Sequence, residues 1–418
     1  MRYWLLFLAL TAFLSSQTVA AKSAWTLNDL YLQALNQSEA VLISAEQIRE
    51  TRARFMQILG GSLPQIGHSD TVIIQDTAAT GSGDDVGSTF TRRHREESKF
   101  YFHQPVFQGF AEYHTAKIQR ASISKETYEL KQEELNLFAD ISAVFITWVR
   151  LGRDIGEYQN IIRVARNRSS ELQGDVELGK ARASQGYAEQ TELKLLEVRV
   201  EQLRSDRLVA EEALMWMTGL KPLPKTLAPR FNLKHLPPAT QGVAQRPDVK
   251  AQQEVTKISE GELKVSRSKL LPHINADANY YHYRTGFQNQ IDWDATFSLD
   301  LPVFNAQNWG EIKAGKSRLR QAALLERQVL KAAGQRFEKA RIRFESARKQ
   351  VQLVVSAAGV ARQRFQSTEE DLRVGRTSTL DILEAQRYYL ETLTQKNQVQ
   401  ANLELAYVNY WLETGHRP

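Results

Sequence analysis

The sequence of this chain contains an internal repeat. Pro105-Val106-Phe107 returns as Pro302-Val303-Phe304, 197 positions later, and Gly179 returns as Gly375, 196 positions later. Several matches at nearly the same spacing rarely arise by chance, so we infer a gene duplication. A duplicated unit of this length usually builds a pseudo-symmetric assembly rather than one catalytic pocket.

The two copies differ in one loop. Leu63-Pro64-Gln65-Ile66 and Leu271-Pro272-His273-Ile274 lie 208 positions apart, so the first copy has eleven extra residues before its Pro-Val-Phe mark. The glycine-rich segment 81–87 falls in this insertion. It lacks the lysine and the Ser/Thr of a phosphate-binding loop, so we interpret it as an enlarged surface loop.

The first 21 residues have the pattern of a secretory signal peptide. Arg2 is followed by an apolar run of 11 residues from Trp4 to Leu14, and small residues lead to Ala20 and Ala21. A spanning helix needs about 20 residues, so we expect cleavage after Ala20 or Ala21. No later stretch looks apolar enough to span as a helix. The chain has no cysteine, which predicts an exported protein without a lipidated N-terminal cysteine.

Charge and composition exclude two classes of function. The formal net charge is +6, and loss of Arg2 with the signal peptide leaves +5, spread over nearly 400 residues of alternating acidic and basic side chains. This is the pattern of solvated helix faces, so no nucleic acid partner is expected. The eight histidines lack metal-ligand spacing, and the paired Asp84 and Asp85 lie in the enlarged loop. We therefore predict no catalytic residues, no metal and no cofactor.

Proline placement divides the chain. Six of the eleven prolines fall within 219–247, which we interpret as a linker between a first repeat, 22–218, and a second, 248–418. Residues 106–218 and 303–417 contain no proline and are rich in helix formers.

Each proline-free block is predicted to be an antiparallel helical hairpin. The hairpins are expected over about 108–218 and 308–414, with glycine turns at Gly179 and Gly375. Leucine and valine at 193, 196, 200 and 203 follow the 3-4-3 spacing of a coiled-coil seam. The first arm alone would reach roughly 105 Å as a helix, far more than a compact domain needs.

Between the Leu-Pro and Pro-Val-Phe segments of each repeat, the spacing of apolar residues changes from that of a helix to that of a strand. Apolar side chains alternate with polar ones from Trp293 to Leu301 and from Ile274 to Tyr280. We predict strands at about 65–76 and 98–107 in the first repeat and at about 273–284 and 293–304 in the second.

Four strands with one apolar face raise the question of what covers that face. In a bilayer every edge amide must be paired, so only a closed barrel is allowed, and bacterial barrels need at least about 8 strands. Three chains would supply twelve. The alternative is a water-soluble pair of hairpins on a core, but the helical blocks leave no obvious core to cover them. We therefore expect a trimeric twelve-stranded transmembrane β-barrel continued by an α-helical tube.

The mature chain resembles the TolC-type outer-membrane efflux proteins (outer membrane factors). The resemblance rests on the duplication, the two Leu-Pro and two Pro-Val-Phe marks, and residues 374–383, which are similar to the second tip of that family. It implies a homotrimeric channel-tunnel that contacts outer membrane lipid and extends into the periplasm. There it would dock a periplasmic adaptor (membrane fusion) protein and, through it, an inner-membrane transporter.

The resemblance also implies the site residues. Asp381 and Glu384 would form two acidic rings at the closed periplasmic end, whereas without the resemblance they would be an ordinary solvated helix face. The docking tips would be Leu178, Gly179 and Lys180 in the first repeat and Val374, Gly375 and Arg376 in the second.

The gate departs from the family pattern. The positions of the family's gating aspartate, tyrosine and arginine are occupied here by Gln185, Leu372 and Thr377. We therefore predict that Arg376, beside Thr377, takes over as the charged lock.

The leading prediction is a passive exit duct in a tripartite efflux or type I secretion system. The competing one is a soluble periplasmic coiled-coil adaptor, an interaction protein without a pore. Adaptors usually have one helical hairpin flanked by small β-domains, whereas here the hairpin occurs twice, each time with its own strand pair. The sequence does not indicate the cargo, which the transporter selects.

Overall fold

The fold was analysed in a computed structural model, which describes residues 25–74, 94–224, 233, 242–285 and 290–418. The predicted signal peptide, the glycine-rich loop and most of the linker lie outside these residues. The elements in chain order are α1 (Leu27–Leu35), α2 (Glu39–Gly61), β1 (Gln65–Ile74), β2 (His94–Gln108), α3 (Ala111–Glu177), α4 (Ala183–Thr218), a 3-10 turn (Val243–Gln245), α5 (Pro247–Ser268), β3 (His273–Arg284), β4 (Trp293–Asp300), α6 (Ala306–Arg373) and α7 (Thr379–Leu412).

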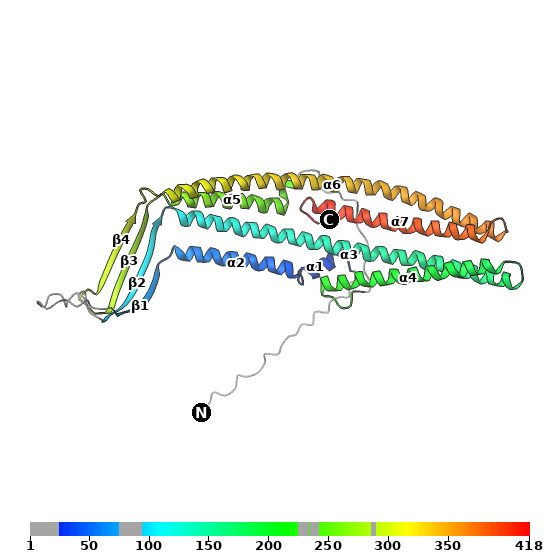
Figure 1. Cartoon of the computed structure of the whole chain (residues 1–418), viewed down its shortest axis with the longest axis horizontal. Helices are drawn as coiled ribbons and strands as arrows, with labels where there is room; N and C mark the ends of the chain where they lie inside the picture. Colours follow the sequence, from blue (N-terminus) through cyan, green and yellow to red (C-terminus); the bar gives the residue numbers. More distant parts are fainter. Residues whose placement is uncertain (1–24, 75–93, 225–232, 234–241, 286–289) are drawn as a thin grey trace, which may run out of the picture.

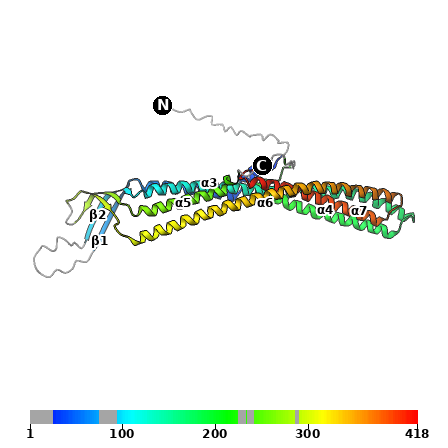
Figure 2. The ribbon, with the colours of Figure 1, turned by 90° about the horizontal axis from the view of Figure 1, so that it is seen from above.

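The molecule is a long rod with the sheet at one end (Figure 1). Helices α3 and α6 have 67 and 68 residues, so each extends about 100 Å at 1.5 Å per residue. Seen from above, the body is a thin layer of helices that continues from the sheet (Figure 2). This shape matches a segment of a wall better than a globular domain.

The set of helices that forms the wall changes half-way along the rod. Near the sheet, α2 packs on α3, α3 on α5 and α5 on α6. In the far half, α4 and α7 take the places of α2 and α5, with α3 contacting both and α6 contacting α7. Each repeat therefore supplies one shorter helix next to the sheet, two strands, one full-length helix and one returning helix, and the first repeat adds α1.

The sheet is antiparallel with the order β1-β2-β3-β4. Its central pair joins the two repeats, since His103 of β2 lies opposite Asp277 of β3. Within the described part of the chain, β1 and β4 each have one paired side, so both outer edges are open.

The two faces of the sheet have opposite character. Phe107 lies opposite Ile274, which lies opposite Leu299, and this row belongs to an exposed apolar face that also carries Ile66, Phe100, Phe102, Phe297 and Trp293. The other face is polar. Its cross-strand hydrogen bonds include His103 Nδ1 to Asp277 Oδ1 at 2.6 Å and Asn279 Nδ2 to Asp294 Oδ1 at 2.8 Å.

The strand ends differ from two of the predicted ranges. Strand β2 begins at His94, four residues before the predicted start, and β4 ends at Asp300, four residues before the predicted end. Strand β4 ends where its partner begins, since Asp300 lies opposite His273, the first residue of β3. At Pro105, β2 continues because the register shifts between Pro105 and Phe107.

One helix passes a simple test for membrane crossing. By length and composition, α3 contains a stretch apolar enough to span, so the expectation that no later stretch would qualify was wrong. Phe138, Ile141 and Phe145 of α3 are buried against Leu30 and Tyr31 of α1 in the largest apolar cluster. These apolar side chains of α3 therefore have a place in the core between helices.

Candidate functional site at the helix tips

Both hairpin turns lie at the end of the rod farthest from the sheet (Figure 1). Each turn satisfies the last carbonyls of its first helix in the same way. At the first tip, the N–H of Gly179 donates to the carbonyl of Val176 at 3.0 Å, and that of Lys180 to Asp175 at 2.8 Å. At the second, Gly375 donates to Leu372 at 3.0 Å and Arg376 to Asp371 at 2.8 Å. This is the Schellman arrangement of a helix C-terminus.

The arrangement explains the repeated glycines. Gly179 and Gly375 both have φ of +72°, and a Cβ at either position would have nothing within 4 Å. The backbone conformation, not the lack of space, therefore requires glycine.

We expect Gly179→Ala to destabilise the first tip by about 1 kcal/mol, because alanine is strained at positive φ. The matched control is Gly174→Ala, five residues earlier in α3, where a Cβ also meets nothing within 4 Å but the backbone is helical. There alanine should stabilise by about 0.5–1 kcal/mol. Thermal unfolding followed by circular dichroism checks both signs. Equal shifts of Tm in one direction would contradict the assignment.

The tips present apolar side chains to solvent. Leu178 is 70% exposed and Val374 is 64% exposed, at equivalent positions just before the two glycines. Lys180 and Arg376 follow the glycines, and both residues are exposed. The six predicted docking residues thus form two similar surface turns.

The structure gives Asp381 a local role that the sequence analysis did not assign. Its carboxylate accepts hydrogen bonds from the Ser378 hydroxyl at 2.6 Å, the Ser378 N–H at 3.0 Å and the Thr377 hydroxyl at 2.9 Å. With the Ser378 hydroxyl accepting from the Asp381 N–H, this is a capping box at the start of α7. The bonds from Ser378 and Thr377 hold the pKa of Asp381 below its usual value, so its negative charge is favoured.

The other predicted charges also have partners within the chain. Glu384 accepts from Arg364 Nη2 at 3.3 Å, and Arg376 Nη1 lies 3.9 Å from Asp371. Both pairs are exposed, so each contributes little to stability.

A cavity of about 680 Å³ lies between the two hairpins behind the tips. Its lining includes Gln185, Leu372 and Thr377, the three positions at which the sequence departs from the gate pattern. Gly375 and Arg168 also line it. The structure therefore brings these three positions together around one space.

Arg168, at the wall of this cavity, belongs to a buried polar cluster that joins three helices. It donates from Nε and Nη2 to Glu189 Oε1 of α4 at 3.0 and 2.7 Å, and from Nη2 to Gln386 Oε1 of α7 at 2.7 Å. Glu189 and Gln386 are 0% exposed. Arg168 Nη1, Glu189 Oε2 and Gln386 Nε2 are buried without a hydrogen-bond partner among the described residues. An ion pair this deep is held by geometry, and loss of one partner leaves a buried charge.

Two further polar contacts cross between α3 and α7. Asn397 Nδ2 donates to Asp154 Oδ1 at 2.8 Å, and Arg153 Nη2 donates to Glu404 Oε1 at 3.3 Å. Burial raises the pKa of both Asp154 and Glu404 above its usual range, although their partners act in the opposite direction. The hairpins are thus joined by polar layers as well as by the apolar cluster that contains Ile161, Leu196 and Ile382.

Sequence analysis missed this cluster, although a signal was present. Leu193, Leu196 and Val200 continue backwards by one seam step to Glu189, and in α3 Ile161 and Ala165 continue forwards to Arg168. A charged residue at a seam position of two neighbouring helices is the signature of a buried pair. Without knowledge of which helices touch, the two halves could not be matched.

Comparison with known proteins identifies similar chains. The family model described as "Outer membrane efflux protein" matches residues 240–409, which is essentially the second repeat. The outer membrane efflux protein BepC of Brucella suis biovar 1 (strain 1330) is 22% identical over 326 residues, covering 74% of this chain and 69% of that protein.

Solved structures of the same shape were also found. A membrane protein from Pseudomonas aeruginosa aligns with a TM-score of 0.84 at 14% identity, over 94% of this chain and 90% of its own. The Campylobacter jejuni CmeC outer membrane channel aligns with a TM-score of 0.79 at 15% identity, over 94% and 86% respectively. At these identities, the likeness establishes the fold along nearly the complete chain.

Proposed function

Because the outer membrane efflux protein model matches residues 240–409 and BepC is similar over 326 residues, we propose that this chain belongs to that family and is the outer-membrane channel of a tripartite efflux or type I secretion system. It is a passive exit duct: an inner-membrane transporter supplies the energy, and a periplasmic adaptor links the two. Export by the predicted signal peptide, with no lipid anchor, completes the proposal. The proposal also includes the division of the chain into repeats at 22–218 and 248–418.

The observation that carries this proposal is the four-stranded sheet with two open edges and two unlike faces. An exposed apolar face needs lipid or a core, and no helix of the described chain packs over it. Open edges cannot exist in hydrocarbon, because each unpaired backbone group there costs several kcal/mol. Pairing β4 of one chain with β1 of the next satisfies both edges, and three chains close a barrel of twelve strands.

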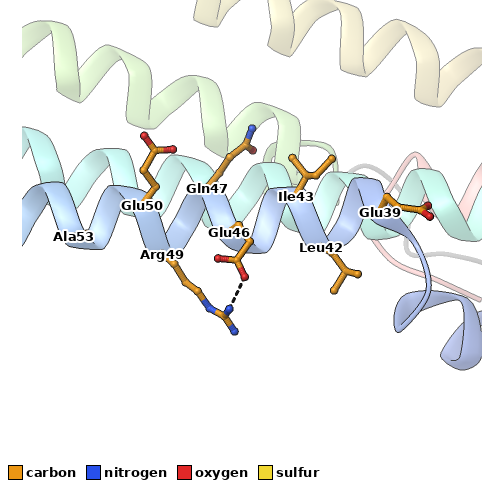
Figure 3. A pocket seen from close by; sticks show the side chains of 8 residues that line it. All are labelled: Glu39, Leu42, Ile43, Glu46, Gln47, Arg49, Glu50 and Ala53. Atoms are coloured by element: carbon orange, nitrogen blue, oxygen red, sulfur yellow. Dashed lines mark hydrogen bonds and ion pairs between the residues drawn. The ribbon is translucent and has the colours of Figure 1, made fainter.

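The helices offer matching edges for the same head-to-tail assembly. Helix α2 lies on one side of the wall and carries the exposed Leu42 and Ile43 beside an ion pair of Glu46 with Arg49 (Figure 3). Helix α6 lies on the opposite side and exposes Leu324, Leu325 and Ile342 along its length. A heterologous contact of this kind generates a closed ring when its rotation closes, and a rotation of one third of a turn gives a trimer.

The alternative is a soluble periplasmic adaptor, and fractionation separates the two. The channel should appear in outer-membrane fractions as a detergent-requiring trimer that conducts ions in a planar bilayer. A monomer that stays in solution without detergent would overturn the channel and favour the adaptor.

Neutralising Asp381 and Glu384 tests the proposed acidic rings. We expect Glu384→Gln to reduce the preference of the open channel for cations about two- to threefold, since three carboxylates leave one ring. Asp381→Asn should reduce it further but also weaken the capping box. The folded pKa of Asp381 is lowered, so its stabilisation is complete above the ordinary value of about 3.9 and is lost as the pH falls through the lowered value. Reversal potentials in a salt gradient measure the preference, and unchanged potentials would contradict the rings.

The proposed lock, Arg376, is tested by leakage. In the free chain it lies 3.9 Å from Asp371 of its own turn, so it can exchange this weak pair for one with a neighbouring subunit. Arg376→Ala should then increase dye entry through the resting channel, and unchanged leakage would exclude it as the lock.

A further inference from the structure

A cavity of about 580 Å³ lies where the sheet meets the helices α3, α5 and α6. Its apolar wall includes Phe110, Leu271 and Trp309, one from the start or end of each helix. Phe110 and Trp309 are more than half exposed. Large aromatic side chains left open to solvent at one level of a membrane protein are typical of a membrane interface.

The apolar wall of the cavity adjoins the apolar face of the sheet. Phe110 packs edge-on against Phe107, with ring centroids 5.0 Å apart. Phe107 lies opposite Ile274 on the apolar face of the sheet, in one row with Leu299. The contact between Phe107 and Phe110 therefore connects the apolar face of the sheet to the wall of the cavity.

The cationic wall lies on the side away from the sheet. Lys264 and Arg267 lie in α5, whose end is followed by Leu271, and Lys316 follows Trp309 by two turns of α6. Each helix thus changes from apolar to cationic over about 6–11 Å in the same direction. Lys264 is paired with Glu260 at 2.6 Å, whereas Arg267 and Lys316 form no ion pair within the described ranges. Two cations are consequently free for a ligand.

His114 lines the same wall but is not counted as a third free cation. Burial, with help from Lys264 and Lys117, holds its pKa below the usual value, so the neutral ring is favoured. Its Nδ1 is buried and has no partner among the described side chains. A neutral imidazole can donate to a phosphate or hydroxyl oxygen.

The cavity lies at the end of the sheet, at the level expected for the headgroups of one leaflet. Strand β3 has 12 residues, which extend about 40 Å at 3.3 Å per residue and about 30 Å when tilted as in a barrel. This is the thickness of the hydrocarbon core, so the helical end of the sheet lies at the headgroups of the periplasmic leaflet. A lipid of that leaflet would place its acyl chains along the sheet and its phosphate toward the helices.

We propose that this cavity binds the headgroup of an anionic glycerophospholipid from the periplasmic leaflet, with Arg267 and Lys316 on the phosphate and Phe110, Leu271 and Trp309 on the upper acyl chains. A guanidinium fork matches phosphate oxygens, and basic cavities between helices select anionic headgroups. The inference rests on the proposed outer-membrane location. It adds a lipid site in each subunit that anchors the junction between barrel and tube.

The test compares two double variants of the full-length protein. Arg267→Gln/Lys316→Gln removes the free cations, and Lys257→Gln/Lys349→Gln removes the same charge from α5 and α6 farther from the sheet. Native mass spectrometry of purified trimers, titrated with phosphatidylglycerol and separately with phosphatidylcholine, measures binding. The wild type and the control should prefer phosphatidylglycerol. The first variant should bind it about 30-fold more weakly, the effect of two lost cations.

Four outcomes would overturn the lipid site. Trimers that conduct but show no headgroup preference, or a first variant that binds phosphatidylglycerol like the wild type, would overturn the lipid site and leave the channel standing. Competition by inorganic phosphate at similar concentration would show a simple anion site and also overturn the lipid. A soluble monomer without conductance would overturn the channel and the lipid site together. Trp309→Ala keeps both cations. If acyl chains contact the apolar wall, this variant should bind both lipids more weakly and to the same degree.

Discussion

Replacing Phe297 by lysine should abolish assembly of the proposed trimer in the outer membrane. Phe297 is 80% exposed on the apolar face of β4. A lysine at the bilayer midplane costs about 2–4 kcal/mol, and three copies in one barrel cost about 6–12 kcal/mol. Heat-modifiable trimers on denaturing gels of outer-membrane fractions measure assembly, and drug or dye accumulation in cells measures the loss of efflux.

The neighbouring residue provides the control. Ser298 points to the opposite, polar face, so Ser298→Lys should leave trimers intact and alter only conductance through the added charge. Equal loss of trimers in both variants would mean that the two faces are wrongly assigned. A harmless Phe297→Lys would mean that the sheet does not contact lipid, which is the outcome that the soluble adaptor predicts.

Glu189→Leu should destabilise the far half of the helical wall by about 3–5 kcal/mol. It leaves the guanidinium of Arg168, which is 8% exposed, without its counter-ion, and a buried unpaired charge has a cost of this size. Thermal unfolding of purified trimers, followed by far-ultraviolet circular dichroism, should show a lower Tm. Limited proteolysis should show earlier cleavage near the tips.

A second substitution separates the missing charge from general damage. Arg168→Met/Glu189→Leu/Gln386→Leu replaces the cluster by apolar side chains of similar volume, which often restores or increases stability. We expect this triple variant to recover most of the lost Tm. If Glu189→Leu alone leaves Tm unchanged, water must already solvate Arg168 and Glu189. The two side chains would then not be buried in the trimer.

The sequence was sufficient to predict the long elements and their symmetry. Proline-free blocks predicted α3 with α4 and α6 with α7, and the glycine turns fall at Gly179 and Gly375 as expected. Residues 273–284 were predicted as a strand and form β3 without change. The fold class is confirmed in its hairpins and four-stranded sheet, and the trimeric barrel stays a prediction.

Other features depend on contacts that a linear pattern does not contain. The end of β4 at Asp300 and the bulge at Pro105 depend on where the partner strand begins and on the register of the pairing. The charges at the tips were expected to face a pore, but the Asp381 carboxylate first completes the cap of its own helix. The acidic rings, the Arg376 lock and the docking role of the tips remain predictions, because they concern surfaces that only other subunits or partners can cover.

The pairing of β2 with β3 joins one repeat to the other inside a single polypeptide. In a closed ring, β4 would meet β1 of the next copy in the equivalent way, so the junction within the chain is a template for the junction between chains. Such a ring has six quasi-equivalent units, and an ancestor of half this length could have built it as a hexamer. If the two halves arose by fusion, they could diverge, and the eleven extra residues of the first half would then occur three times in such a ring instead of six.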